Sequence, residues 1–327
     1  MFFCIFYPPS QGILQVTITP PMKPYFLPLL LTLLLQSCFF TGVESTPRIT
    51  AGDVKREREP VTAEDTFLAS TADAPLGQWH PGKEFVVTDP RISLIFGATA
   101  PSGGLPAGGT ITFAGASEAR SVAGLPVTDL TFLSPGGNEL VYRINRPLAT
   151  LMEERSLSVP YTIQSSVVSS ADNAMRDRDL YILTLVWRDS TDTPIDGGRK
   201  FVKVHIDSVT PGNSHFPLKA SFTDTRGLSA CIFFHPGAKG AFPRTFPTIF
   251  SFTDPYLRYQ STMPATWDLI TRGKVADGMT REECRLALGA PKEIDRGATQ
   301  SYLREAWLYE NGVYLLFEDG ILKSFRR

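Results

Sequence analysis

The sequence predicts a mainly β protein with a small α+β domain at its C-terminal end. Glycine and proline each occur 26 times and phenylalanine 22 times, which is typical of a turn-rich β protein. Runs of aromatic and β-branched residues bounded by turn formers recur from Gly82 onward. In residues 262–327 two short helical patterns precede three strand-like runs. We therefore expect two related small β-barrel or sandwich modules, followed by a helix-helix-three-strand domain.

Near its start the chain has the layout of a secretory signal, displaced from Met1. Reading from Met22 gives MKPYFLPLLLTLLLQSC, in which Lys23 precedes an apolar run over residues 25–35 and no acidic residue interrupts it. The run has about 11 residues, whereas a helix needs about 20 to cross a bilayer. We expect residues 1–37 to be an upstream extension and a signal peptide, with the true start at Met22.

The end of the apolar run resembles the lipobox of bacterial lipoproteins. In LQSC, Leu35 supplies the aliphatic residue three places before the cysteine and Ser37 the small residue just before it, whereas Gln36 departs from the stricter motif. The resemblance implies that Cys38 receives diacylglycerol on its sulfur and becomes the mature N-terminus, and that its acyl chains anchor the protein in the outer membrane of a cell envelope. The alternative is an ordinary signal peptide in which Cys38 is incidental.

Charge and hydropathy exclude other classes of partner. Loss of residues 1–37 removes only Lys23 from the 32 basic residues and none of the 33 acidic ones. This balance argues against the clustered basic face that binds nucleic acid, so we expect no nucleic-acid partner. No further apolar run is long enough to span a membrane. Membrane contact is therefore expected through the N-terminal lipid alone.

The segment that follows the signal predicts a tether. Residues 38–77 are polar, mix both charge signs and contain few aromatic residues, which is typical of a flexible linker. Within it, TAEDTFLAS carries an N-terminal helix signature, because Thr62 precedes Glu64 and Asp65. A short helix there is an open alternative.

Two β modules are expected next, at residues 78–177 with a linker and at residues 178–261. Strand patterns occur in GKEFVVTDPRISLIFG, GGTITFAGA, PVTDLTFL, ELVYRI, YTIQSSVV and LYILTLVWRD, with a helix near PLATLMEE and a hairpin signal at SPGGNE. The stretch from GRKFVKV to SACIFF repeats the layout of the stretch from GGTITF to LVYRI about 90 residues later. The repeat predicts that the two modules are related.

The last segment, residues 262–327, predicts a domain of its own. MPATWDLITRG and MTREECRLALG are two short helices, and Thr280 with Glu283 forms a capping-box pattern before the second. Gly289 followed by Pro291 is a stop signal. Three strands follow in REAWLYENGVYLLFEDGILKSFRR, joined by the tight turns ENG and EDG.

This segment resembles the BamE/SmpA/OmlA type of lipoprotein domain, in which G-M-T opens a helix, L-G-x-P closes it, and a W-x-Y strand leads into F-x-x-G. The resemblance implies a small helix-on-sheet fold in an envelope lipoprotein, and it covers about 60 residues. The matching positions are Gly278, Met279, Thr280, Leu288, Gly289, Pro291, Trp307, Tyr309, Phe317 and Gly320. They specify a fold rather than a binding surface.

Both faces of the C-terminal sheet carry large apolar residues. Trp307 and Phe317 belong to the parity expected to pack on the helices, which leaves Leu308, Tyr314 and Leu316 on the reverse face. A small domain exposed to water on one side should avoid such a face. We expect these three residues to face a partner, with either the preceding β module or another protein covering them.

Few residues suggest chemistry. Cys231 lies in a strand-like run and Cys284 on a predicted helix, so two separately buried thiols are the simpler prediction and a disulfide is the alternative. His205 and Asp207 share a strand face, where a metal or acid-base pair competes with an ordinary surface histidine. The sequence lacks the common nucleophile, phosphate-binding and zinc motifs. We expect no catalytic residue, no cofactor and no metal.

These patterns together predict a non-enzymatic envelope lipoprotein that acts as a binding or scaffold component, with a protein partner in outer-membrane or envelope assembly. The alternative is an envelope hydrolase, or an inhibitor of one, with its site in the β modules. The two functions differ in whether carboxylates or histidines of those modules converge in a concave pocket.

Overall fold

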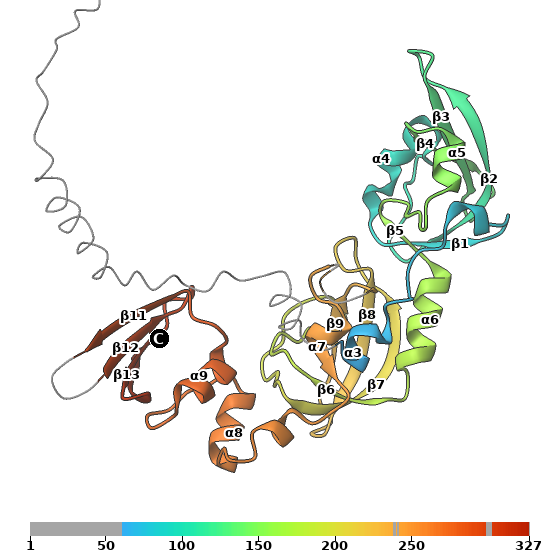
Figure 1. Ribbon diagram of the computed structural model, residues 1–327. Coiled ribbons are helices and arrows are strands. Elements are labelled where there is room, and N and C mark those ends of the chain that lie inside the picture. Colours follow the sequence, from blue (N-terminus) through green and yellow to red (C-terminus); the bar gives the residue numbers. More distant parts are fainter. Residues whose placement is uncertain (1–60, 238–239, 241, 299–302, 327) are drawn as a thin grey trace, which may run out of the picture. The chain divides into compact units, whose positions relative to one another are not determined.

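The computed structural model describes residues 61–237, 240, 242–298 and 303–326 (Figure 1). Three antiparallel sheets dominate the described chain, so the protein is mainly β. The signal segment with Met22, the lipidation candidate Cys38 and residues 38–60 of the expected tether lie outside the described residues. Among the residues that the structure describes, no helix has the length and hydropathy needed to cross a membrane.

The first sheet has five strands in the order β4-β3-β2-β1-β5. These are β1 (Glu84–Val87), β2 (Thr110–Arg120), β3 (Pro126–Leu133), β4 (Glu139–Ile144) and β5 (Thr162–Gln164). The short helices α4 (Ser93–Phe96) and α5 (Leu148–Met152) contribute Phe96 and Leu151 to a core formed with residues of the strands. The sequence RISLIF, expected as strand, is helical because Asp89 caps a 3-10 turn that begins at Pro90.

The second sheet also has five strands, in the order β10-β6-β7-β8-β9. These are β6 (Asp179–Ile182), β7 (Val202–Pro211), β8 (Leu218–Asp224), β9 (Ser229–Phe234) and β10 (Phe250–Ser251), with α6 (Ser165–Met175) before β6 and α7 (Phe246–Ile249) before β10. Much of the run YTIQSSVV is therefore helix α6 and not strand. Its buried residues Val167, Ala171 and Met175 recur every four positions, which is the spacing of a helix face packed on a core.

Residues 61–77, expected to be tether, are folded. Helix α3 (Ala63–Phe67) carries the Thr62–Asp65 capping box that the sequence indicated. The ring of Phe67 lies 4.6 Å from that of Phe246, and Leu68 is buried in the second core. The charged residues around these apolar side chains give the segment the composition of a linker, which is why the sequence indicated a tether. The tether prediction is wrong for this part of the chain.

The two five-stranded sheets share one design, as the repeat in the sequence predicted. In each, four strands form a meander, and a fifth returns after a short helix to pair with the first strand (Figure 1). Both meanders carry a register shift at the same place, after Phe113 and after Ile206. In the second sheet, Arg188, which follows β6, also pairs with Cys231 of the end strand β9 through two backbone hydrogen bonds. The distinction between a barrel and a sandwich stays a prediction.

The third sheet has the order β11-β12-β13-β14 and lies in the C-terminal segment. Its strands are β11 (Glu293–Ala298), β12 (Leu303–Leu308), β13 (Tyr314–Glu318) and β14 (Ile321–Arg326), preceded by α8 (Pro264–Thr271) and α9 (Arg281–Leu288). The sequence predicted both helices, the Thr280–Glu283 capping box and three of the strands. Strand β11 was missed because EIDRGA has a glycine and only one large apolar residue.

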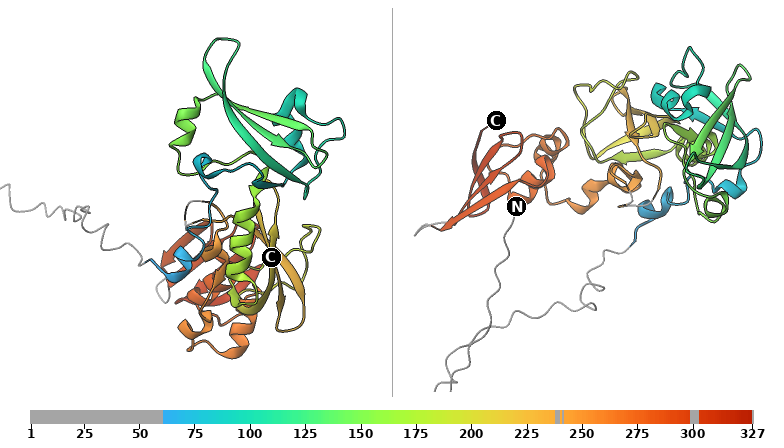
Figure 2. Two further views of the ribbon diagram at one scale, coloured as in Figure 1. Left: turned by 90° about the vertical axis from the view of Figure 1, so that its right-hand side faces the viewer. Right: turned by 90° about the horizontal axis from the view of Figure 1, so that it is seen from above.

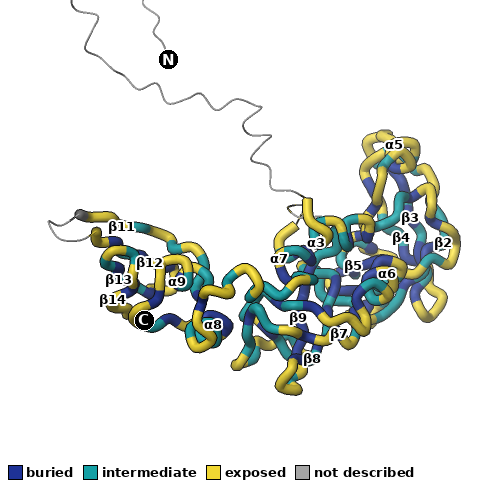
Figure 3. Tube along the Cα trace, turned by 60° about the horizontal axis from the view of Figure 1, so that its bottom comes forward, coloured by how far each residue is buried: buried dark blue, intermediate teal, exposed yellow. Residues whose placement is uncertain are grey.

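The parity expected for the third sheet is confirmed. Trp307 and Phe317 are buried with residues of α8 and α9, whereas Leu308 on the reverse face is 38% exposed and Tyr314 and Leu316 are half-buried. Buried positions alternate with half-buried or exposed ones along β12 and with half-buried ones along β13 (Figure 3).

Two residues just before β7 contact the helices of the C-terminal segment. The ring of Phe201 stacks on Trp267 of α8 at 5.7 Å, and the Lys200 ammonium donates to the Ala287 carbonyl of α9 at 2.8 Å. Neither contact involves Leu308, Tyr314 or Leu316, so what covers these three residues stays a prediction. A protein partner remains the predicted cover.

The two thiols are confirmed as separate and buried. Cys231 lies on β9 and Cys284 on α9, and both are free. Burial raises the pKa of Cys284 to about 12. Since the thiolate is the reactive form, this cysteine acts as a small core residue.

Candidate functional site: an arginine-lined cavity

A cavity of about 800 Å³ opens between α9 and the third sheet. Its wall has mixed charge: the guanidinium groups of Arg281, Arg285 and Arg296 lie with the buried carboxylate of Glu305 and the carboxylates of Glu282 and Asp319, and Leu286, Trp307 and Ile321 contribute apolar side chains. A second cavity of about 470 Å³ shares Arg281, Arg296 and Glu305 and adds Arg304 and the 66% exposed Leu303. We refer to the two together as the arginine-lined cavity.

Regular structure places the charged groups. Arg281 and Arg285 are four residues apart on α9, so they lie on one helix face. Arg296 and Glu305 are direct partners in the pairing of β11 with β12, and Trp307 follows on the same face of β12. The cavity therefore depends on the packing of α9 against the sheet.

Glu305 is the buried centre of this cluster. Its Oε1 accepts from Trp307 Nε1 at 2.6 Å and its Oε2 accepts from Arg281 Nη1 at 2.8 Å, while Arg296 Nε lies 3.5 Å away. Burial by itself would raise the pKa of Glu305, but the hydrogen bonds from Trp307 and Arg281 outweigh it and hold the pKa below its ordinary value of 4.5. The carboxylate is therefore ionised at neutral pH.

The arginines keep unused hydrogen-bond donors. Side chains of Arg281 and Arg296 are 52% and 72% exposed, although both reach Glu305. The Arg285 guanidinium lies over the Trp307 ring at 5.2 Å, a cation–π contact that orients it. Gly320 in the EDG turn has a φ of 83°, and a Cβ there would come within 3.3 Å of the Arg281 guanidinium. Glycine at this turn therefore leaves room for Arg281.

Within this mixed-charge wall, the exposed guanidinium groups are the part suited to recognition of an anionic group. Each arginine presents five N–H donors in a planar fork that matches a carboxylate or phosphate. Ile321 and Leu303, which are 36% and 66% exposed, supply apolar surface beside those donors, and the buried Trp307 ring supports Arg285 from below. The wall lacks an obvious nucleophile, and Glu305 is held too acidic for proton transfer near neutral pH.

Comparison with protein-family models, with curated proteins and with solved structures found no match. The resemblance to the BamE/SmpA/OmlA type therefore continues to rest on the motif residues of the C-terminal segment.

The cavity is not where the sequence placed a binding surface. Leu308, Tyr314 and Leu316 project from the opposite face of the sheet, and Cys38 lies outside the described residues. Sequence reasoning missed the arginines and Glu305. The four-residue spacing of Arg281 and Arg285 was visible, but nothing local linked it to Glu305.

The histidine proposed for acid-base or metal chemistry has a different partner. His205 Nδ1 lies 3.0 Å from Asp179 Oδ1 on the neighbouring strand, whereas Asp207 accepts from the Thr223 hydroxyl. His205 and Asp179 are both about half exposed. In the described part of the chain, no group of three or more histidine, cysteine or acidic side chains is arranged to hold a metal ion.

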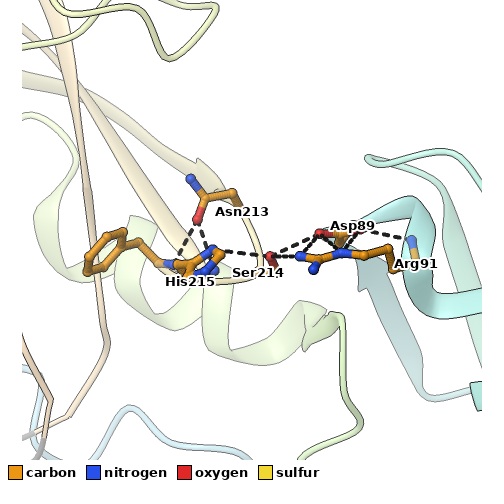
Figure 4. A network of polar contacts seen from close by, with 6 residues as sticks. Asp89, Arg91, Asn213, Ser214 and His215 are labelled. Atoms are coloured by element: carbon orange, nitrogen blue, oxygen red, sulfur yellow. Dashed lines mark hydrogen bonds and ion pairs between the residues drawn. The ribbon is translucent and has the colours of Figure 1, made fainter.

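Carboxylate and histidine groups of the two β sheets do converge at one further place. The Ser214 hydroxyl donates to Asp89 Oδ2 at 3.0 Å and lies 3.4 Å from Nδ1 of His215 (Figure 4). Arg91 also binds the Asp89 carboxylate, and its hydrogen bonds hold the pKa of Asp89 far below the ordinary value. In a hydrolase triad the histidine stands between the hydroxyl and the acid. Here the hydroxyl stands between them.

Proposed function

We propose that this protein is a lipid-anchored, non-enzymatic component of the bacterial cell envelope that binds a partner protein through its C-terminal segment. In this proposal, lipid on Cys38 fixes the chain to the outer membrane. Residues 262–327 form a BamE/SmpA-like α+β domain, and the arginine-lined cavity receives an acidic and partly apolar segment of the partner. A role as an accessory in outer-membrane or envelope assembly follows from the resemblance.

The observation that carries the proposal is the state of Glu305. A catalytic carboxyl that transfers protons works best with a pKa near the working pH, whereas Trp307 and Arg281 keep Glu305 ionised. A permanently charged, buried carboxylate fixes the positions of Arg281 and Arg296. Fixed donors beside exposed apolar surface are the features of a recognition site.

The hydrolase alternative has less support. A hydrolase would be expected to bring carboxylates and histidines together in a concave pocket of the β modules. The group of Asp89, Ser214 and His215 has the wrong order for a triad, and its carboxylate is engaged by Arg91.

The experiment is quantitative capture of partners from membranes. Tagged full-length protein is solubilised, and the co-purifying proteins of the native chain and the Arg296→Glu variant are compared by mass spectrometry. Arg296 is 72% exposed, so the reversal repels an acidic ligand, but it also sets a carboxylate opposite Glu305. Circular dichroism and the melting temperature of the purified variant therefore separate loss of binding from loss of the fold. We expect the amount of the specific partner to fall about tenfold, the equivalent of about 1.4 kcal/mol.

Arg155→Glu is the matched control, since it makes the same charge reversal at an exposed position of the first sheet's segment. Equal loss of the partner in both variants would indicate a general charge effect. Full retention of every partner by Arg296→Glu would contradict the assignment of the cavity.

A further inference from the structure

The second five-stranded sheet contacts the first through the tip of a hairpin. The tip between β7 and β8, residues 213–216, presents the Ser214 hydroxyl to Asp89 Oδ2 at 3.0 Å, and Arg91 Nη2 donates to Ser214 Oγ at 3.3 Å (Figure 4). Asp89 and Arg91 directly follow β1. We call residues 213–216 the second tip, and Asp89 with Arg91 the first acceptor.

Backbone hydrogen bonds fix which residues correspond in the two sheets. The N–H of Gly108 donates to the Val87 carbonyl as that of Phe201 donates to Ile182, and the N–H of Thr88 donates to Tyr161 as that of Leu183 donates to Ile249. Thr184 and Val186 therefore take the places of Asp89 and Arg91 in the second sheet, and we call them the second acceptor. The tip of the β2–β3 hairpin, residues 121–125, takes the place of Ser214 and His215, and we call it the first tip.

The first tip has no cover in the described structure. Strands β2 and β3 pair as far as Arg120 and Pro126, beyond the reach of β1, so their hairpin projects past the rest of the sheet (Figures 1 and 2). At the tip Val122 is 110% exposed and Leu125 is 64% exposed. Such apolar exposure at the end of a projecting hairpin is typical of a contact site.

The second acceptor is also uncovered, and its chemistry differs from that of the first. Val186 is 46% exposed and borders a mainly apolar cavity of about 470 Å³ together with Phe242, Ile232 and Ile249, while Arg244, Thr184 and Thr248 add polar groups to its wall. Phe242 is 49% exposed. Within the chain a polar tip meets a polar acceptor. The unpaired tip and the unpaired acceptor both expose apolar side chains.

We propose that the first tip of one copy of this protein docks in the second acceptor of another copy. The contact repeats between chains the tip-to-acceptor contact that joins the two sheets within the chain, with Val122 and Leu125 in place of Ser214. Such an interface joins different surfaces of the two copies. Two copies that exchange both tips form a closed dimer, whereas copies that each donate a tip to the next copy form an open linear assembly.

Cross-linking between tagged copies tests the contact directly. One full-length chain carries Val122→Cys and a second, with another tag, carries Val186→Cys, and the two are expressed together and treated with a short bismaleimide. We expect a cross-linked product that bears both tags. The matched control replaces Val186→Cys by Leu94→Cys, which is 74% exposed on α4 of the first sheet. The proposal would be overturned if the Leu94→Cys control gave as much doubly tagged product. It would also be overturned if the test pair gave no more of that product than chains without an added cysteine.

A charge pair provides a second measurement that does not depend on cross-linker reach. Val122→Lys places a positive charge in a cavity that Arg244 also lines and should lower mutual capture of the tagged chains about tenfold, because burying an unpaired charge beside a like charge is costly. Val186→Asp should restore capture when combined with Val122→Lys. Met152→Lys is the control, since Met152 is 50% exposed and belongs to neither surface. Undiminished capture with Val122→Lys would refute the docking of this tip.

Discussion

At the residue scale, Glu305 both stabilises the C-terminal segment and positions the arginines of the cavity. It is 7% exposed, and each of its carboxylate oxygens accepts a hydrogen bond from Trp307 or Arg281. Replacing it would leave the indole N–H and the guanidinium without a charged acceptor in a site that water reaches poorly. Hydrogen bonds to charged groups contribute more to stability than neutral ones.

We therefore expect Glu305→Gln to lower the free energy of unfolding by about 1–3 kcal/mol at neutral pH. Urea denaturation followed by tryptophan fluorescence measures the change. Glu310→Gln is the control, because Glu310 is exposed in the ENG turn, and it should shift stability by less than about 0.5 kcal/mol. A Glu305→Gln variant as stable as the control would show that these hydrogen bonds contribute nothing net.

The difference in the free energy of unfolding between the native chain and Glu305→Gln should depend on pH with a definite sign. The folded-state pKa of Glu305 is below 4.5, so the unfolded state binds more protons in this range. The stabilisation is fully present above pH 4.5 and is lost as the pH falls through the folded pKa. The native chain and Glu305→Gln should accordingly converge in stability on the acid side and stay apart from pH 5 to 7.

At the element scale, the third sheet separates two surfaces. The face with Trp307 and Phe317 holds the helices and the arginine-lined cavity, while the reverse face carries Leu308, Tyr314 and Leu316. The contacts with the second sheet's segment described above lie at α8 and α9, and we expect a partner to cover the reverse face.

We expect Tyr314→Glu to reduce co-purification of a partner while the helices and sheet stay folded, since Tyr314 is half-buried and outside the core. Circular dichroism and mass spectrometry of captured proteins measure the two properties. Met152→Glu, an exposed apolar position elsewhere, is the control. The prediction is refuted when Tyr314→Glu retains the same partners at the same amounts.

Most of the core of the C-terminal segment is made of its own residues, including Trp307, Phe317 and Ile270, although Phe201 also packs against it and Arg199 and Lys200 donate hydrogen bonds to its helices. We expect a fragment of residues 262–327 to be soluble and to unfold cooperatively in urea. It should be less stable than in the full chain, because it loses Phe201 from the stack on Trp267. A disordered fragment would mean that the segment depends on its neighbour.

At the scale of the whole molecule, the repeat determines what is left exposed. Each of the two sheets has one hairpin tip and one acceptor, and within the chain the second tip contacts the first acceptor. The first tip and the second acceptor therefore have no partner within the described chain, and both expose apolar side chains. Anchoring to a membrane would raise their local concentration and favour such a contact.

We expect Cys38→Ser to move the protein from the membrane fraction to the soluble fraction. The physical reason is that stable anchoring needs more than one acyl chain, which the LQSC sequence predicts for Cys38. Fractionation of cells followed by immunoblotting measures the distribution. Cys231→Ser is the control, since Cys231 is buried in β9. Continued membrane association of Cys38→Ser would refute the lipid anchor.

The sequence by itself determined the features that depend on neighbouring residues. These are the β class, the caps at Thr62 and Thr280, the tight turns, and the buried parity of β12 and β13. Such signals act over a few residues, through hydrogen bonds of a cap or the alternation of a strand. The repeat was also visible, because it copies turn residues at a constant spacing.

Only the tertiary structure decided the features that join distant residues. It paired β5 with β1, turned the run after Gln164 into helix α6, and brought Arg281 to Glu305. The β-branched residues of SSVV favour a strand locally, but burial of Val167, Ala171 and Met175 against the second core favours a helix. The cavity could not be predicted for the same reason. Its charge arrangement exists only when α9 packs on a sheet whose strand order no local pattern specifies.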